Sequence, residues 1–170
     1  MLVIPGPASL ELGGKVAELL KVKTVNVVFK RFPDGESYIR LKGKVKNEEI
    51  VIVQTTSPPQ DTNLFQLFLM ADTARDLGAK KISAVIPYLA YSRQDKRFLS
   101  GEAFSIETAA KLLKESGVTK VLTVNVHDQK VFSKFSFSAQ SVSAIPLLAE
   151  HFKNRGLLGA FVLAPDEGAK

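Results

Sequence analysis

The clearest indication of the fold lies in residues 81–97, Lys81-Ile-Ser-Ala-Val-Ile86 followed by Pro87-Tyr-Leu-Ala-Tyr-Ser-Arg-Gln-Asp-Lys-Arg97. The first six residues are mostly apolar and predict a buried strand, and the second run ends in a dense polar cluster. In open α/β sheets, ligands bind beyond the carboxyl ends of the strands. Arginine forks onto phosphate oxygens and lysine supplies a point charge, so this cluster suits a polyphosphate. The alternative is a solvated charged loop, which is common on protein surfaces.

Other segments share the apolar, β-branched pattern of Lys81–Ile86. They are Ile50–Gln54, Val121–Val126 and Gly159–Leu163. Helical patterns separate most of these segments. Continuous apolar strands alternating with helices are typical of a parallel sheet that is covered on both faces. The sequence therefore predicts a doubly wound α/β fold with a mostly parallel sheet. Three further strands are expected nearer the amino terminus, at Met1–Ile4, Thr24–Phe29 and Ser37–Leu41.

Four helices are expected between these strands. The first starts after a cap at Ser9, and its apolar side chains fall on one face. These side chains are Leu12, Val16, Leu19 and Leu20. The second is capped by Asp61 or Thr62 and carries Leu64, Leu67, Phe68, Ala71 and Ala74 in helical register up to Gly78. The third runs from near Ser105 to Gly117 with Ile106, Ala109, Leu112 and Leu113 inward, and the fourth covers Ile145–Lys153.

The first helix contains Gly13-Gly14-Lys15, which invites comparison with a phosphate-binding P-loop. That motif opens with a glycine, and a serine or threonine that touches the metal follows its lysine. Here no glycine opens the motif, and Val16 follows the lysine. The sequence therefore excludes a P-loop.

The segment Ser133–Ser143 is rich in serine and phenylalanine and predicts an irregular crossing segment between two domains. Residues 1–143 are then an amino-terminal α/β domain. Residues 144–170 are the start of a second, similar domain that is incomplete in this chain.

Composition limits the classes of function. The chain has 170 residues, of which 45% are hydrophobic, and this favours a globular fold with a real core. It has no cysteine, which excludes disulfides and thiolate metal sites and is compatible with the cytoplasm. No uninterrupted apolar run is long enough to cross a bilayer, and the first residues lack the pattern of a signal peptide. The net charge of +6 is spread over many turns and helix ends, so we expect no nucleic-acid partner.

Three successive predicted strands end in polar groups. Arg93-Gln94-Asp95-Lys96 follows the first, His127-Asp128 the second and Asp166-Glu167 the third. If the strands are parallel neighbours, these groups converge on one edge, where carboxylates, a histidine and two cations suit a magnesium–nucleotide site. Each group also has a purely structural interpretation, since histidines occur at strand ends and Pro165-Asp-Glu-Gly168 favours a type I turn.

Phe32-Pro33-Asp34-Gly35-Glu36 lies between two predicted strands. Pro-Asp-Gly is a strong turn signal, so Asp34 and Gly35 have a structural reason to be there. Phe32 and Glu36 have less of one. An aromatic face beside two acceptors can stack on a nucleotide base and bind its exocyclic amine.

Taken together, these residues resemble the ribose-phosphate diphosphokinase family, which makes 5-phosphoribosyl 1-diphosphate. The matching residues keep their order over almost the whole chain, and the run Pro-Tyr-x-x-Tyr-x-Arg-Gln-Asp-Lys is highly specific to that family. The matching segments are Phe32–Glu36, Ile52–Gln54, Asp61–Leu64, Ile86–Lys96, Val126–His127 and Pro165–Ala169.

The resemblance implies a fold of phosphoribosyltransferase-like type and a reaction. In that reaction the anomeric hydroxyl of ribose 5-phosphate attacks the β-phosphorus of Mg-ATP, and AMP leaves. It implies that Arg93, Gln94, Asp95 and Lys96 bind the nucleotide and its phosphates. His127 is implied to lie beside the transferring group and its Mg²⁺.

For Asp166, the resemblance implies a place in the metal and ribose region. In the family, the segment that matches Phe32, Asp34 and Glu36 reaches the adenine of a neighbouring subunit. The resemblance therefore implies a homo-oligomer with a shared nucleotide site.

Two departures from the family pattern qualify this resemblance. Asn125 stands where the family usually has an aspartate, and an amide is a weaker ligand for Mg²⁺, although Asp128 could compensate. The chain also ends at Lys170, ahead of the family's mobile catalytic loop and its ribose-phosphate loop, so we expect this chain alone to be inactive. A non-catalytic regulatory or scaffold relative and a phosphoribosyltransferase remain alternatives.

Overall fold

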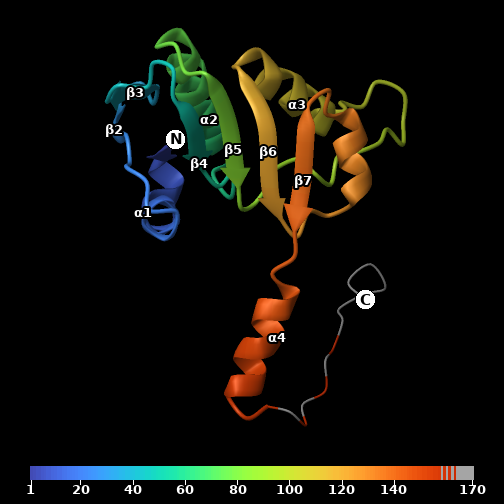
Figure 1. The fold of residues 1–170 in the computed structure, drawn as a ribbon. Helices are drawn as coiled ribbons and strands as arrows, with labels where there is room; N and C mark the ends of the chain where they lie inside the picture. The colour runs from blue at the N-terminus through green and yellow to red at the C-terminus, as the bar shows by residue number, and fades with distance from the viewer. Residues whose placement is uncertain (158, 160, 162, 164–170) are drawn as a thin grey trace.

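The computed structural model describes residues 1–157, 159, 161 and 163. Its centre is a five-stranded sheet with the order β1-β4-β5-β6-β7, and every neighbouring pair is parallel (Figure 1). The strands are β1 (Leu2–Pro5), β4 (Glu49–Val53), β5 (Lys81–Ile86), β6 (Val118–Val124) and β7 (Ser138–Val142). A separate antiparallel hairpin is formed by β2 (Asn26–Arg31) and β3 (Ser37–Lys42).

The helices are distributed over both faces of this sheet. They are the 3₁₀ helix η1 (Pro7–Ser9), α1 (Leu10–Leu19), α2 (Gln60–Asp76), α3 (Ser105–Glu115), the 3₁₀ helix η2 (Gln129–Lys134) and α4 (Ile145–Asn154). Strand side chains alternate between faces. Val3 and Val53 pack with Ala17 of α1, whereas Ile4 and Ile52 belong to the large core beneath α2 and α3. The predicted doubly wound, mostly parallel α/β fold is therefore confirmed.

The predicted inward face of α1 was wrong for its three leucines, whereas Val16 is half-buried and packs against Val3, Ala17 and Val53 as expected. Leu12, Leu19 and Leu20 are exposed, and Leu19 keeps 83% of its surface accessible. The buried residues of the helix are instead Gly13 and Ala17. The helix lies so close to β1 that a Cβ atom on Gly13 would fall 2.8 Å from the Cα of Pro5. Only small residues fit at this contact, so the leucines of the helix are on the outside.

Leu112 was also expected to point inward, and it is 46% exposed. The remaining inward residues predicted for α3, Ile106, Ala109 and Leu113, are buried. Both α2 and α3 are followed by glycines with positive φ, 84° at Gly78 and 95° at Gly117, as expected of glycines that terminate helices.

The segment Ser133–Ser143 is not irregular throughout, because it contains strand β7. Residues 138–142 pair in parallel with β6, and their burial alternates between exposed and half-buried. A strand at the end of the sheet, built largely from polar residues, lacks the continuous apolar run that identified the central strands. Strand β6 ends at Val124, two residues before the predicted end, because Asn125 has a φ of 46°.

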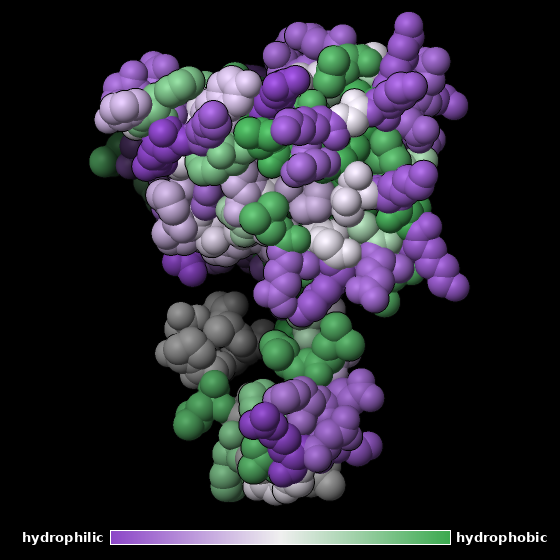
Figure 2. All heavy atoms as spheres, turned by 90° about the vertical axis from the view of Figure 1, so that its left-hand side faces the viewer, coloured by the Kyte–Doolittle hydropathy of each residue, from purple (hydrophilic) through white to green (hydrophobic). Residues whose placement is uncertain are grey.

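Helix α4 projects away from the sheet (Figure 1). Its apolar side chains are exposed and form a green area on the lower part of the molecule in Figure 2. They include Ile145, Leu147, Leu148 and Phe152. The division into residues 1–143 and 144–170 stays a prediction. None of the helices in the described part of the chain is long and apolar enough to span a membrane.

Candidate functional site

Two of the three predicted polar clusters leave the sheet at the same edge. Strands β5 and β6 are parallel neighbours, with Ile86 opposite Thr123 near their carboxyl ends. The loop that begins at Pro87 and the segment that begins at Asn125 therefore start side by side. The third cluster, Asp166 with Glu167, and part of the predicted strand Gly159–Leu163 lie outside the described residues.

The start of the first loop is fixed by Thr56, a fully buried residue that follows β4. The carbonyl oxygen of Tyr88 accepts hydrogen bonds from the Thr56 backbone N–H at 3.0 Å and from its hydroxyl at 2.6 Å. The same hydroxyl oxygen accepts a bond from the N–H of Ala90 at 2.8 Å. Because Leu89 and Ala90 are also buried, the polar residues that follow start from a rigid base.

A tight turn then brings Arg93 and Gln94 to the surface. The carbonyl oxygen of Tyr91 accepts the N–H of Gln94 at 2.9 Å, and Tyr91 itself has a φ of 64°. The Tyr91 hydroxyl donates to the carboxylate of Asp61 in the first turn of α2. This bond, together with partial burial and the negative charge of Asp61, raises the pKa of Tyr91 above its ordinary value.

Arg93 and Gln94 line two adjoining cavities. The first has a volume of about 350 Å³, and the second about 290 Å³. Gln60, Asp61, Tyr88, Tyr91 and Ser92 complete the first, and Lys96, Phe98, Glu102 and Ala103 complete the second. Within the described residues, neither Arg93 nor Lys96 forms an ion pair with a carboxylate. Two unneutralised cations beside a cavity are what an anionic ligand requires.

The far part of the loop is organised by Glu102. Its carboxylate accepts the N–H of Phe98 at 2.7 Å and of Leu99 at 3.1 Å, and these bonds lower the pKa of Glu102. Its carbonyl oxygen accepts the Nε–H of Arg97 at 2.9 Å. Arg97 is therefore occupied in holding the loop, in contrast to Arg93.

His127 is exposed at the same edge as the Arg93 loop, but its neighbours are already engaged. The carboxylate of Asp128 caps η2 by accepting the N–H of Lys130 at 2.8 Å. The side-chain oxygen of Asn125 accepts the N–H of Ala144 at 2.7 Å, so it ties the end of β6 to the approach to α4.

The described residues contain only part of the predicted magnesium site. They contain no cluster of three or more histidine, cysteine, aspartate or glutamate side chains that could hold a metal. Of the two predicted metal ligands, His127 is present at the edge, and Asp166 lies outside the described residues. Magnesium that arrives bound to a triphosphate keeps most of its ligands as water and phosphate oxygens, so it needs few protein groups.

The hairpin tip lines a different cavity. The backbone N–H of Phe32 donates a hydrogen bond to the carbonyl oxygen of Glu36 at 2.8 Å, and the Asp34 carboxylate accepts the N–H of Glu36 at 3.1 Å. The adjacent cavity, of about 500 Å³, is lined by Arg31, Gly35, Glu36, Ser37, Thr62, Phe65 and Leu69. Within this chain, Glu36 and Arg93 thus line separate cavities. Helix α2 borders both of them, through Thr62 in the cavity of Glu36 and through Asp61 in the cavity of Arg93.

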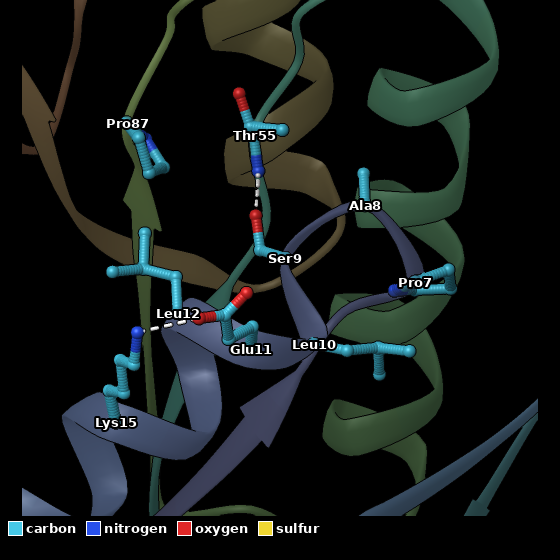
Figure 3. Close-up of a pocket in the computed structure, with 9 residues that line it drawn as sticks. All are labelled: Pro7, Ala8, Ser9, Leu10, Glu11, Leu12, Lys15, Thr55 and Pro87. Carbon is cyan, nitrogen blue, oxygen red and sulfur yellow. Dashed lines mark hydrogen bonds and ion pairs between the residues drawn. The ribbon is translucent and has the colours of Figure 1, made fainter.

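Sequence reasoning missed one further cavity, of about 520 Å³ (Figure 3). It is lined by Pro7, Ala8, Ser9, Leu10, Glu11, Leu12, Lys15, Thr55 and Pro87. It lies beyond the carboxyl ends of β1 and β4, where the chain continues into α1 on one face of the sheet and into α2 on the other. Ligand crevices of open α/β sheets occur at such points. Its lysine is paired with Glu11 at 2.6 Å, so the cavity is less suited to an anion than the one at Arg93.

Asp61, Tyr91 and Ser105 were also absent from the predicted site. The Ser105 hydroxyl donates a hydrogen bond to the side-chain oxygen of Gln94, and the Asp61 carboxylate accepts one from the Tyr91 hydroxyl. Asp61 and Ser105 lie at the starts of helices, and their sequence signal was that of helix termini. Only the folded chain places them against the loop.

Comparison with known proteins identifies the family. A family model described as the N-terminal domain of ribose phosphate pyrophosphokinase matches residues 1–117. A ribose-phosphate pyrophosphokinase from Saccharolobus solfataricus is 44% identical over 169 residues, which are 99% of this chain and 58% of that protein. One from Methanothermobacter thermautotrophicus is 42% identical over 168 residues, again 99% of this chain and 58% of the relative.

A solved structure supports the same family assignment. The crystal structure of phosphoribosylpyrophosphate synthetase from Mycobacterium smegmatis superposes with a TM-score of 0.84 at 28% identity, covering 91% of this chain and 51% of that one. The chain thus spans a little over half the length of the proteins that it matches. The family resemblance expected from the sequence is confirmed: this chain belongs to the ribose-phosphate pyrophosphokinase family.

Proposed function

We propose that this chain provides the nucleotide-binding part of an enzyme that transfers the diphosphoryl group of Mg-ATP to the 1-hydroxyl of ribose 5-phosphate. The products are 5-phosphoribosyl 1-diphosphate and AMP. The observation that carries the proposal is the Arg93 guanidinium, which lies beside Gln94 on a cavity of about 350 Å³ and pairs with no carboxylate of the described residues. Membership of the family supports the choice of reaction.

In this proposal the chain acts by binding and orientation. Arg93 and Lys96 neutralise phosphate charge, and Gln94 and Asp95 supply hydrogen bonds to the nucleotide. Phosphoryl-type transfer depends mainly on positioning and on charge stabilisation, so a site without a covalent nucleophile is adequate. His127, on the neighbouring strand end, lies beside the transferring group. Magnesium supplies charge neutralisation when it is bound to the triphosphate.

The proposal also includes a homo-oligomer. Phe32 is 45% exposed on the hairpin tip, and Asp34 and Glu36 are exposed with it. Because Glu36 and Arg93 line separate cavities of one chain, we propose that this tip contacts the adenine held by the Arg93 loop of a neighbouring subunit. The enzyme as a whole is proposed to be cytoplasmic, and this chain alone to be inactive.

Calorimetric titration with Mg-ATP tests the nucleotide site. Replacing Arg93 by Ala should weaken binding about tenfold or more, since a hydrogen bond to a charged group contributes roughly 1.5–3 kcal/mol. Lys111→Ala is the matched control, because it removes the same charge from α3, where Lys111 pairs with Glu107 at 2.7 Å. Equal ATP affinity in the Arg93 and Lys111 variants refutes the proposed role of Arg93.

A second candidate is a non-catalytic regulatory or scaffold relative of the enzyme. The observation that favours it is Asn125, whose side-chain oxygen is committed to the N–H of Ala144. An assay for AMP release separates the two candidates when it is done on a chain extended to the full length of the relatives. A scaffold stays inactive when complete, whereas the enzyme turns over.

A further inference from the structure

Tyr91 has an unusual backbone conformation for a tyrosine. Its φ of 64° lies in the left-handed region, which residues other than glycine adopt rarely and at a cost in energy. Residues in such conformations persist only where surrounding contacts enforce them, and they are concentrated at ligand clamps and switch regions. The contacts that hold Tyr91 therefore bear on the function of the loop.

The backbone of Tyr91 closes the turn that carries the proposed phosphate ligands. Its carbonyl oxygen accepts the N–H of Gln94 at 2.9 Å, which places Arg93 inside the turn. On the preceding side, Ala90 is bonded to Thr56, and both residues are buried. The turn thus begins from a buried, hydrogen-bonded residue, and its geometry is set at Tyr91.

The side chain of Tyr91 connects this turn to another element. The ring packs against the core, and the hydroxyl donates to the carboxylate of Asp61 in the first turn of α2. On the other side of the turn, the Ser105 hydroxyl at the start of α3 bonds the Gln94 side chain. The turn is therefore held between two helix starts.

Arg93 depends on these contacts for its position. Within the described residues, its guanidinium has no hydrogen-bond or ion-pair partner that could orient it, and the residue is exposed. Its placement relative to the cavity follows from the backbone of the turn alone. A ligand site whose backbone is already in the bound geometry spends less free energy on ordering when the ligand arrives.

We propose that Tyr91 is a positioning residue, whose hydroxyl bond to Asp61 holds the turn in the geometry that presents Arg93 and Gln94 to the nucleotide. This inference rests on the proposed function, in which Arg93 and Gln94 hold the phosphates of ATP. It adds two residues, Tyr91 and Asp61, that act through the turn.

The first test measures amide hydrogen exchange of residues 91–97 without nucleotide, with strand β4 as the internal reference for an intact fold. Tyr91→Phe and Asp61→Ala should each speed exchange about tenfold, the factor expected for loss of one hydrogen bond to a charged group. Asp61→Asn keeps an acceptor oxygen and should restore most of the protection. Combining Tyr91→Phe with Asp61→Ala should add little, because both remove the same bond.

Tyr88→Phe is the matched control for exchange. It removes a hydroxyl three residues away that, in the described part of the chain, donates to no protein atom. Exchange in Tyr91→Phe that stays within twofold of the unmodified chain overturns the inference, whatever Arg93→Ala does to ATP binding.

The second test measures Mg-ATP affinity by calorimetry. Tyr91→Phe and Asp61→Ala should weaken binding about five- to tenfold, and Asp61→Asn should recover affinity together with exchange protection. Faster exchange with unchanged ATP affinity overturns the positioning role. If Arg93→Ala leaves ATP affinity unchanged, the proposed function fails, and the nucleotide part of this inference fails with it.

Discussion

Two adjacent glycines of α1 offer a clean separation of local from tertiary effects on stability. Gly13 is buried against β1, and a Cβ atom there would lie 2.7 Å from the Cβ and 2.8 Å from the Cα of Pro5. At Gly14 a Cβ atom would meet nothing within 4 Å. Both residues lie in the same helix, so replacing either by Ala gives a similar gain in helix propensity, about 0.8–1 kcal/mol.

Gly14→Ala should therefore raise the free energy of unfolding by about that amount. Gly13→Ala has the same gain, but it forces atoms into a packed contact with backbone, at a cost of about 1–3 kcal/mol. The difference between the two variants should then be about 1–3 kcal/mol, because the propensity term cancels. For a chain of 170 residues this corresponds to roughly 2–12 °C in Tm, with Gly14→Ala the more stable.

Urea unfolding followed by circular dichroism at the helix band measures this difference. The midpoint should move in opposite directions or by clearly unequal amounts in the two variants, while the slope m stays constant, since the surface exposed on unfolding is the same. A Gly13→Ala chain as stable as Gly14→Ala would refute the close contact of α1 with β1. It would also remove the physical reason for the exposed leucines of that helix.

Three further predictions concern single side chains. The hydrogen bond to Asp61 favours the neutral form of Tyr91, so the bond is present below the ordinary tyrosine pKa and is lost as the pH rises through the raised pKa of the folded chain. In an ultraviolet pH titration, Tyr91→Phe should remove a tyrosine transition that lies above the ordinary tyrosine pKa. Asn125→Ala should lower the Tm by several degrees, because it removes the acceptor of the Ala144 N–H and places alanine at a φ of 46°, which asparagine tolerates better. Asn125→Asp keeps the acceptor and should unfold near the Tm of the unmodified chain. The buried Thr123 hydroxyl has no hydrogen-bond partner within the described residues, so Thr123→Val should raise the unfolding free energy by about 1 kcal/mol in urea, and a loss of stability would contradict that assignment.

The central part of the fold could be predicted from the sequence because its signals are local and redundant. The strand Lys81–Ile86 and the start of α3 at Ser105 were predicted with the bounds that the structure has. Glycines at 78 and 117 marked the ends of α2 and α3. A short, continuous apolar run between two helical patterns is typical of a strand buried on both faces, so these elements needed no tertiary information.

The same reasoning failed where burial depends on what lies opposite. The leucines of α1 have helical spacing, but the helix approaches β1 too closely to place them inward, so the buried residues are Gly13 and Ala17. Strand β7 is largely polar and was mistaken for an irregular segment. In both places the deciding quantity is the distance to a neighbouring element, which a single sequence does not contain.

For the site, the amino-acid sequence by itself determined the chemistry, namely three cations with an amide and a carboxylate in the loop after a buried strand. Only the tertiary structure decided which of those cations are available. Arg97 is bonded to the carbonyl of Glu102, while Arg93 is left without a carboxylate partner among the described residues. Charge is a property of the residue, whereas neutralisation depends on which groups the folded backbone brings within a few ångströms of it.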